Sequence, residues 1–234
     1  MSTLTLVRHG QAQAFQTTQA ALSTTGELQA AKVAEFWLRN GTRFDEVYSG
    51  TLPRQVRTEE LAGECFRAAG EIWPVAVRDQ AWNEYDATGV LQHLLPADAN
   101  LNAMAARFEQ ARDTPEEYRQ FQRMFEAAMG LWLEGTVECD GVEPWPAFRS
   151  RVSGAIKRIM AGPAGRRVVV FTSGGPIGFA VHLAMQAPAR SFLEVNWRVR
   201  NTSVTNFVFD RSRLTLDGFN SISHLDEAEL WTYR

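Results

Sequence analysis

The sequence predicts an α/β fold: a three-layer α/β/α sandwich with a mostly parallel central sheet and a helical cap insertion. Short runs of β-branched and apolar residues alternate with helix-like patterns, which is the order of a parallel sheet covered on both faces. Three of these runs end in polar or glycine-rich turns that open a helix. The chain length of 234 residues suits one domain over residues 1–234. Only helix-like patterns occur around residues 100–135, so we expect a helical cap inserted at about 90–140.

The strands are predicted from apolar, β-branched runs that stop at turn residues. The first run stops at Arg8, His9 and Gly10, and the second at Ser49 and Gly50. Pro74 lies in the third run and cannot donate to a ladder, which places that strand at an edge of the sheet. The expected strands are Thr3–Val7, Phe44–Tyr48, Ile72–Val77 and Arg167–Thr172, followed by a hairpin of Ser203–Phe209 and Leu214–Phe219.

The helices are predicted from capping signals and apolar faces. Thr24 and Glu27 have the spacing of a capping box, and Pro53 suits the first turn of a helix that begins near Thr51. Further helices are expected within residues 100–135, at Trp145–Met160 and at Pro176–Gln186. The expected apolar faces are Leu28, Ala31, Phe36 and Leu38 in the first helix, and Tyr118, Phe121, Phe125, Ala128 and Trp132 in the segment that Thr114 and Pro115 begin.

The composition limits the classes of partner. The net charge of −3 gives no general attraction to nucleic acid or to acidic membranes. No apolar stretch reaches the roughly 18 residues of a membrane span, and the N-terminus lacks a signal-peptide pattern. Cys65 and Cys139 lie far apart without a CxxC motif, which argues against a zinc site and a disulfide framework. We therefore expect a cytoplasmic protein that binds neither nucleic acid nor membranes.

The three strand-to-helix turns carry the residues of a candidate anion site. Such turns meet at the carboxyl ends of parallel strands, where ligands bind. Arg8 and His9 come from the first turn, Arg54 from the second, and Ser173 and Gly174 from the third. A glycine pair before a helix is often only a tight turn, and an arginine in a first helical turn is often solvated. The convergence of residues from three turns at one edge of the sheet favours an anion site. Glycines allow a ligand to approach the backbone closely, and a helix N-terminus attracts negative charge.

These residues also resemble a known family. Residues 6–12, LVRHGQA, are similar to the signature of the histidine phosphatase superfamily, the phosphoglycerate mutase-like proteins of branch 1. The resemblance continues in order through LSTTGELQA, YSGTLPRQVRTEE, WNEYDATG, VVVFTSGGPIG and NTSVTNFVFD. It is loose between residues 90 and 140. The resemblance implies a phosphoglycerate mutase-like fold and an enzyme that acts on a small phosphorylated substrate.

Carried over to this chain, the resemblance implies that His9 is the nucleophile and forms a phosphohistidine. It implies that Arg8 and Arg54 bind the phosphoryl oxygens and that Glu84 is the proton donor. A neutral imidazole is a competent nucleophile near neutral pH. Guanidinium groups offset the negative charge that spreads over the equatorial oxygens of a phosphoryl group during its transfer. No metal ion or cofactor is then required. The remaining substrate-binding residues are expected to be Gln11, Arg57, Ser173 and Gly174.

The role of Glu84 has an alternative at the level of the sequence. A proton donor needs a raised pKa, which the neighbouring Trp82 and Tyr85 could provide. Asp86 is a competing carboxylate in the same segment, and a solvated acidic loop is the plain structural interpretation.

Ser173 departs from the family pattern, which has a second histidine at this position. A serine donates one hydrogen bond but brings no charge, so transition-state stabilisation should fall. Either turnover is slow or another cation takes part, with Arg57 the first candidate and His93 a weaker one. His182 lies too far into the next helix to substitute.

Three functions remain open on the sequence alone. A phosphatase is favoured over a mutase because residues 11–21, QAQAFQTTQAA, lack the asparagine and the glycine–tryptophan pair that family mutases carry after the RHG motif. The third hypothesis, motivated by Ser173, is a catalytically weak phospho-ligand-binding protein. The cap is expected to select the substrate, whose identity the sequence leaves open. The oligomeric state is also open, with a homodimer as one option.

Overall fold

The structure is a computed structural model that describes residues 1–13, 20–135 and 141–233. It divides into two compact units, one made of Met1–Glu84 and Arg151–Arg234, the other of Tyr85–Ser150. Cys139 and most of the segment that distinguishes phosphatases from mutases, residues 14–19, lie outside the described residues. Among the helices that the structure describes, none is long and apolar enough to cross a membrane.

The first unit is built on a six-stranded sheet of order β3-β2-β4-β1-β5-β6. Strands β3, β2, β4 and β1 are parallel to one another, whereas β5 pairs antiparallel with β1, and β6 pairs antiparallel with β5 at the other edge. The strands are β1 (Ser2–Arg8), β2 (Glu46–Ser49), β3 (Val77–Arg78), β4 (Arg167–Thr172), β5 (Val204–Phe209) and β6 (Leu214–Ser221). The predicted α/β fold with a mostly parallel sheet is confirmed.

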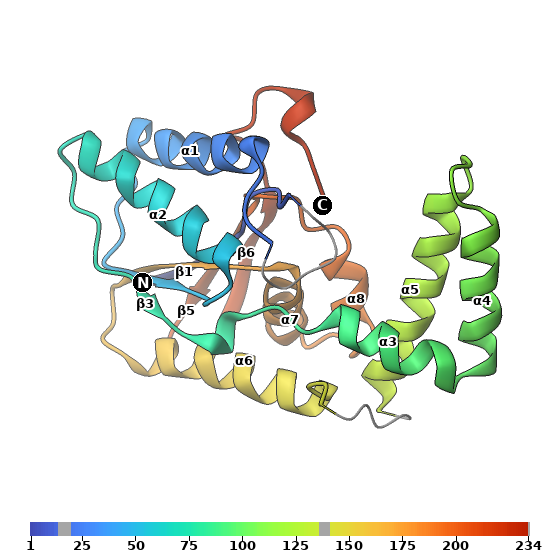
Figure 1. Ribbon diagram of the computed structural model, residues 1–234. Coiled ribbons are helices and arrows are strands. Elements are labelled where there is room, and N and C mark those ends of the chain that lie inside the picture. The colour runs from blue at the N-terminus through green and yellow to red at the C-terminus, as the bar shows by residue number, and fades with distance from the viewer. Residues whose placement is uncertain (14–19, 136–140, 234) are drawn as a thin grey trace. The chain divides into compact units, whose positions relative to one another are not determined.

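Helices cover both faces of this sheet (Figure 1), with α1 and α2 on one face and α7 and the part of α6 from Arg151 onward on the other. Alternation along β4 divides the core, because successive side chains of a strand point to opposite faces. Val169 and Phe171 pack with Trp37 of α1 and Phe66 of α2. The helices of this unit are α1 (Thr24–Arg39), α2 (Pro53–Ala68), α7 (Gly174–Met185) and α8 (Ser191–Asn196), with 3-10 turns η1 (Gln80–Trp82) and η2 (Ala228–Leu230); α6 spans Trp145–Ala161.

Helix α1 corrects two details of the sequence analysis. Its N-cap is Ser23, whose hydroxyl accepts the backbone N–H of Gly26 at 3.1 Å, so the predicted capping box at Thr24 is one residue late. The predicted apolar face is only partly correct: Phe36 and Leu38 are half-buried and pack against the core, whereas 46% of Leu28 is exposed. The residues that α1 buries are Gly26, Gln29, Ala30, Val33, Ala34 and Trp37.

The third strand is shorter and later than predicted, although its edge position is correct. Only Val77 and Arg78 pair with β2, next to Tyr48 and Ser49. The preceding residues leave the ladder because Trp73 turns into the core, where its indole N–H donates to Glu59 at 2.9 Å. Helix α7 begins two residues earlier than the sequence suggested, at Gly174.

The second unit contains three consecutive helices, α3 (Ala87–Ala97), α4 (Ala99–Gln110) and α5 (Glu117–Glu134). The predicted apolar face of α5 is partly confirmed, because Ala128 and Trp132 are buried, but 65% of Tyr118 is exposed. Met124 and Met129 are buried in addition. Within this unit the ring of Tyr85 stacks on Trp132 with 4.8 Å between the ring centroids. The residues expected to form the catalytic and binding site all belong to the first unit.

Candidate active site

His9 follows directly after β1 and is buried, with 6% of its surface exposed. Its backbone N–H donates to the carbonyl of Thr172 at the end of β4, across 2.9 Å. Its ring Nδ1 lies 2.7 Å from the carbonyl oxygen of Gly10. A carbonyl oxygen can only accept, so Nδ1 carries the hydrogen of the neutral ring and Nε2 keeps a lone pair. Nε2 is therefore the ring atom whose lone pair is available.

Arg54 lies in the first turn of α2 and reaches that atom. Its Nε–H donates to Nε2 of His9 at 3.1 Å, and only 8% of Arg54 is exposed. The pKa of His9 is lowered well below its ordinary 6.5, first by burial, then by the positive charges of Arg54 and Arg8, while the bond to Gly10 opposes the shift. Burial also lowers the pKa of Arg54, and the carboxylate of Glu84 opposes this. His9 is thus a neutral imidazole beside two cations.

Two further residues fix the backbone around His9 and Arg54. The hydroxyl of Thr58 accepts the N–H of Gly10 at 3.1 Å and donates to the carbonyl of Arg54 at 2.7 Å, so it ties the His9 loop to α2. The guanidinium of Arg8 donates through Nη1 to the carbonyl of Val199. Thr58 was not among the predicted site residues, although its position one helical turn after Arg54 is a signal that could have identified it.

The loop after His9 packs closely on the start of α1. A Cβ atom on Gly10 would lie 2.3 Å from the carbonyl oxygen of Gly26, and one on Gly26 would lie 2.1 Å from that of Gln11. The backbone N–H of Gln11 donates to the side-chain oxygen of Gln29 at 2.9 Å, and the side-chain oxygen of Gln11 accepts from Ser23 at 2.8 Å. Gln11 therefore lies against the N-terminus of α1, next to the His9 loop.

A buried polar network supports the His9 backbone from behind. The amide of Asn201 donates to the carbonyl of His9 at 3.1 Å. The hydroxyl of Thr232 donates to Asn201 at 2.9 Å and accepts from Gln29 at 2.9 Å. Gln29 also donates to the carbonyl of Leu230 at 2.7 Å. These side chains connect α1, the segment before β5 and the C-terminal segment to one loop, and sequence patterns alone gave them no role.

Glu84 lies at the N-terminus of α7. Both of its carboxylate oxygens accept the backbone N–H of Gly175, at 3.0 and 3.1 Å. Arg151 holds the preceding loop by donating to the carbonyls of Asn83 at 2.8 Å and Ala81 at 3.0 Å. The competing carboxylate has a structural use, because Asp86 accepts the N–H of Gly89 at 2.9 Å and caps α3. The N-terminus of α7 thus binds an anion, and that anion is the side chain of Glu84.

Ser173 and Gly174 form the junction between β4 and α7. Ser173 is fully buried, and its hydroxyl oxygen accepts a hydrogen bond from the amide of Gln55 at 2.8 Å. A Cβ atom on Gly174 would lie 2.4 Å from the side-chain oxygen of Asn196, so a side chain there would have to displace the Asn196 amide. Ser173 follows Thr172, whose carbonyl accepts from the N–H of His9, so the junction lies beside His9.

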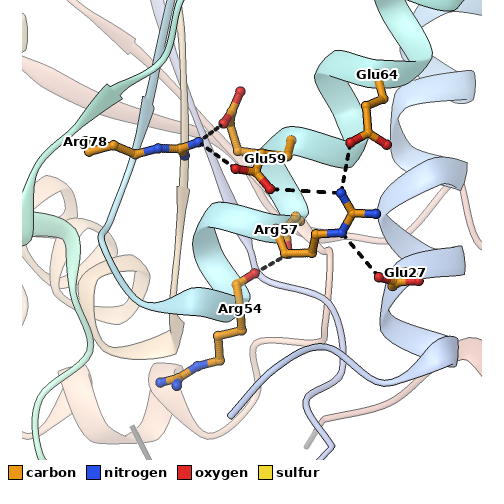
Figure 2. A network of polar contacts seen from close by, with 8 residues as sticks. Glu27, Arg54, Arg57, Glu59, Glu64 and Arg78 are labelled. Carbon is orange, nitrogen blue, oxygen red and sulfur yellow. Dashed lines mark hydrogen bonds and ion pairs between the residues drawn. The ribbon is translucent and has the colours of Figure 1, made fainter. Parts of the chain in front are cut away.

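Figure 2 shows that Arg57 points away from Arg54, although both lie near the start of α2. Its guanidinium donates to Glu27 at 3.2 Å and to Glu64 at 2.8 Å. The two histidines that the sequence analysis weighed as substitutes have other contacts. Nδ1 of His93, in the second unit, lies 3.0 Å from the carbonyl of Gly89, and His182 neighbours the ring of Phe179.

The structure therefore brings together most of the predicted site. Arg54 is hydrogen-bonded to His9 and interacts with the charge of Glu84, and Ser173 follows the residue that accepts the His9 N–H. Arg57 lies in a separate ion-pair network. Within the described ranges, no three side chains of the metal-binding types His, Cys, Asp or Glu gather to hold a metal ion.

Comparison with known proteins gives one family and a consistent set of folds. The family model described as "Histidine phosphatase superfamily (branch 1)" matches residues 4–122 and 96–222. A curated relative, a 2,3-bisphosphoglycerate-dependent phosphoglycerate mutase of Corynebacterium kroppenstedtii, is 34% identical over 101 residues, which are 41% of this chain and only 39% of that protein.

Two solved structures show the same fold at low identity. One is a mutant of phosphoserine phosphatase from Entamoeba histolytica in complex with phosphoserine, with a TM-score of 0.63, 18% identity, and coverage of 96% of this chain and 100% of that chain. The other is a putative α-ribazole-5'-P phosphatase from Escherichia coli, with a TM-score of 0.67, 18% identity, and coverage of 94% and 96%.

Proposed function

Because the chain belongs to the histidine phosphatase superfamily (branch 1), we propose that it hydrolyses a small phosphomonoester through a phosphohistidine on His9. The observation that carries this proposal is the state of His9. Its ring is buried and neutral, its Nδ1 is fixed on Gly10, and its Nε2 lies against Arg54. Such a ring can attack at neutral pH without first losing a proton.

In the first step, the lone pair of His9 Nε2 forms a bond to phosphorus while the bond from phosphorus to the ester oxygen breaks. The leaving oxygen takes a proton from the carboxylic acid of Glu84, which becomes a carboxylate. Arg54 and Arg8 hold the phosphoryl oxygens and offset the charge that spreads over them. The Arg54 hydrogen bond to Nε2 passes to a phosphoryl oxygen when Nε2 becomes covalently bound.

In the second step, a water molecule attacks phosphorus and the nitrogen–phosphorus bond breaks. The electron pair returns to Nε2, so His9 is again a neutral imidazole. Glu84 takes the proton of the attacking water and is ready for the next substrate. The net reaction is a phosphomonoester and water giving an alcohol and inorganic phosphate.

Glu84 must carry a proton when the first step begins. In the structure its side chain accepts an N–H of α7 and interacts with the charge of Arg54. In this proposal, a dianionic phosphoryl group bound to the same arginines favours the protonated acid, because two like charges at close range disfavour an ionised carboxylate. Substrate binding therefore prepares the acid in this proposal.

The proposed substrate class rests on the charges of the site. Two arginines and a few neutral donors suit one phosphoryl group on a small molecule. A structural neighbour with the same fold was solved with phosphoserine bound, which supports phosphorylated metabolites of that kind as the first compounds to test.

A mutase is the second candidate, because the curated relative is a phosphoglycerate mutase. The two functions differ in the fate of the phosphoryl group. We would incubate the protein with phosphoserine, 3-phosphoglycerate and an aryl phosphate, and follow inorganic phosphate and positional isomers separately. Release of phosphate that His9→Ala abolishes supports the phosphatase. Isomerisation without release supports the mutase, and phosphate binding with neither reaction supports a phospho-ligand-binding protein.

A further inference from the structure

The fully buried side chain of Gln55 has a hydrogen-bonding pattern that can be assigned without ambiguity. Its oxygen accepts the backbone N–H of Leu52 at 3.2 Å, and its nitrogen donates to the carbonyl of Trp82 at 3.0 Å. An N–H can only donate and a carbonyl can only accept, so the amide cannot be turned the other way. Its second hydrogen is then directed at the hydroxyl oxygen of Ser173, 2.8 Å away.

This arrangement determines what the Ser173 hydroxyl can do. A hydroxyl group has one hydrogen to donate, and the Ser173 oxygen is already the acceptor for Gln55. Across the part of the chain that the structure describes, no acceptor is bonded to the Ser173 hydrogen. Ser173 therefore retains one O–H donor, beside the residue whose carbonyl holds the His9 backbone.

Helix capping does not explain the serine. Ser173 occupies the N-cap position of α7, where serine usually accepts an N–H of the first turn, but its side chain makes no such bond. Glu84 takes the N–H of Gly175 instead. The serine oxygen is thus turned toward Gln55 and not toward the helix that it begins.

The surroundings of Gln55 are shaped to keep it there. A Cβ atom on Gly50 would lie 1.9 Å from the side-chain oxygen of Gln55, so the strand-to-helix turn leaves room for the amide only because residue 50 is glycine. The carbonyl of Trp82, which Gln55 contacts, also accepts from Thr172 at 2.6 Å. Helix α2, strand β4 and the loop before Glu84 therefore meet at this amide.

We propose that Gln55 is a positioning residue that directs the Ser173 hydroxyl hydrogen at the phosphoryl group transferred to His9. The pair supplies a neutral hydrogen-bond donor where the family pattern has a histidine. This inference rests on the proposed phosphoryl chemistry at His9. It predicts that Gln55 acts through Ser173, so that replacing Gln55 weakens vanadate binding only while Ser173 is present.

The test is the binding of orthovanadate, which mimics the five-coordinate phosphorus of the transition state and needs no turnover. We would measure vanadate and inorganic phosphate binding by calorimetry for the wild type, Gln55→Met, Ser173→Ala and the double variant, with thermal unfolding as the check on folding. Each single variant should weaken vanadate binding by about tenfold, and phosphate binding by less. The double variant should be no weaker than Ser173→Ala.

Gln55→Glu adds a readout that a purely structural role would not produce. An ionised carboxylate would accept from Ser173, which reverses the hydrogen bond and points the serine lone pairs at the phosphoryl group. Its vanadate affinity relative to the wild type should therefore fall as the pH rises from about 5 to 8.

Three results would overturn the inference: wild-type vanadate affinity in a folded Gln55→Met, losses that add in the double variant, or a wild type that does not bind vanadate. The predicted vanadate pattern in a protein that never releases phosphate would instead uphold the inference and reject the proposed hydrolase.

Discussion

Nε of Arg54 donates to Nε2 of His9 across 3.1 Å, although the two residues are 45 positions apart in the chain. The lone pair that attacks phosphorus in our proposal is therefore already held by a group that binds the phosphoryl oxygens. This contact keeps the ring oriented and neutral before substrate arrives. We therefore expect Arg54 to be the cation on which the proposed reaction depends most.

Replacing Arg54 should be far more damaging than replacing Arg57, three positions later on the same helix. Arg54→Lys removes the planar fork and the bond to His9, and we expect kcat/KM to fall by about 10²- to 10³-fold. Arg57→Lys changes a half-exposed network with Glu27 and Glu64, and we expect less than about a threefold change. Steady-state kinetics of phosphate release compare the two. A large loss in Arg57→Lys would instead support the sequence-based expectation that Arg57 replaces the missing histidine charge.

The pH dependence of kcat/KM should reflect the neutral state of His9. Its pKa lies well below 6.5, so the free enzyme keeps an unprotonated nucleophile as the pH falls through 6.5, and the acidic limb of the profile should lie below that value. Arg54→Ala removes one of the charges that lower this pKa, so its acidic limb should move toward neutral pH. An acidic limb of the wild type at or above 6.5 would contradict the assignment.

His224 should make the folded protein sensitive to acid. It is buried against Thr202, 3.0 Å from its hydroxyl, and burial lowers its pKa from 6.5 to about 4. As the pH falls below 6.5, His224 takes up a proton in the unfolded chain before it does so in the folded protein. The contribution of the neutral His224 to the free energy of unfolding is therefore complete above that pH. It should fall by about 3 kcal/mol as the pH drops to about 4.

The matched variant is His224→Asn, which keeps a polar group for Thr202 but cannot titrate. Urea unfolding at several pH values should give a smaller loss of stability on acidification in the variant than in the wild type. Equal losses in the two proteins would show that His224 does not carry this dependence.

Gly26 and Gly130 offer a matched pair of glycines in helices. A Cβ atom on Gly26 would meet the Gln11 backbone at 2.1 Å, so Gly26→Ala should displace the loop after His9 and lower both stability and activity. Nothing lies within 4 Å of the corresponding position on Gly130, where alanine should stabilise α5 by about 0.5 to 1 kcal/mol. Thermal unfolding and turnover of the two variants check this. A stable, fully active Gly26→Ala would mean that the close approach is not required.

The sequence predicted the sheet and most helices, and it singled out His9, Arg54 and Ser173 because each lies in a strand-to-helix turn whose pattern is local. Glu84 was singled out only by the family resemblance. The sequence misplaced Arg57, since the direction of a side chain on α2 depends on which carboxylates α1 and α2 present to it. Figure 2 shows this choice plainly, with Arg57 among carboxylates and Arg54 turned away from them.

The residues that hold the site from behind could not be identified from the sequence. Asn201 and Thr232 reach the His9 backbone only through tertiary hydrogen bonds from distant segments. Gln55 looks like an ordinary helical residue until β4 and the loop before Glu84 are placed beside it. Polar residues in buried networks have no periodic signature, because their partners and not their spacing determine their role.

The central claim is that phosphate passes through His9, and trapping that intermediate tests it most directly. We would mix the protein with an aryl phosphate, quench the reaction early in alkali, and locate the added phosphate by mass spectrometry, with His9→Ala as the control. The account predicts phosphate on His9 of the wild type, together with release of inorganic phosphate, and neither label nor release in His9→Ala. Release by His9→Ala at the wild-type rate would contradict it.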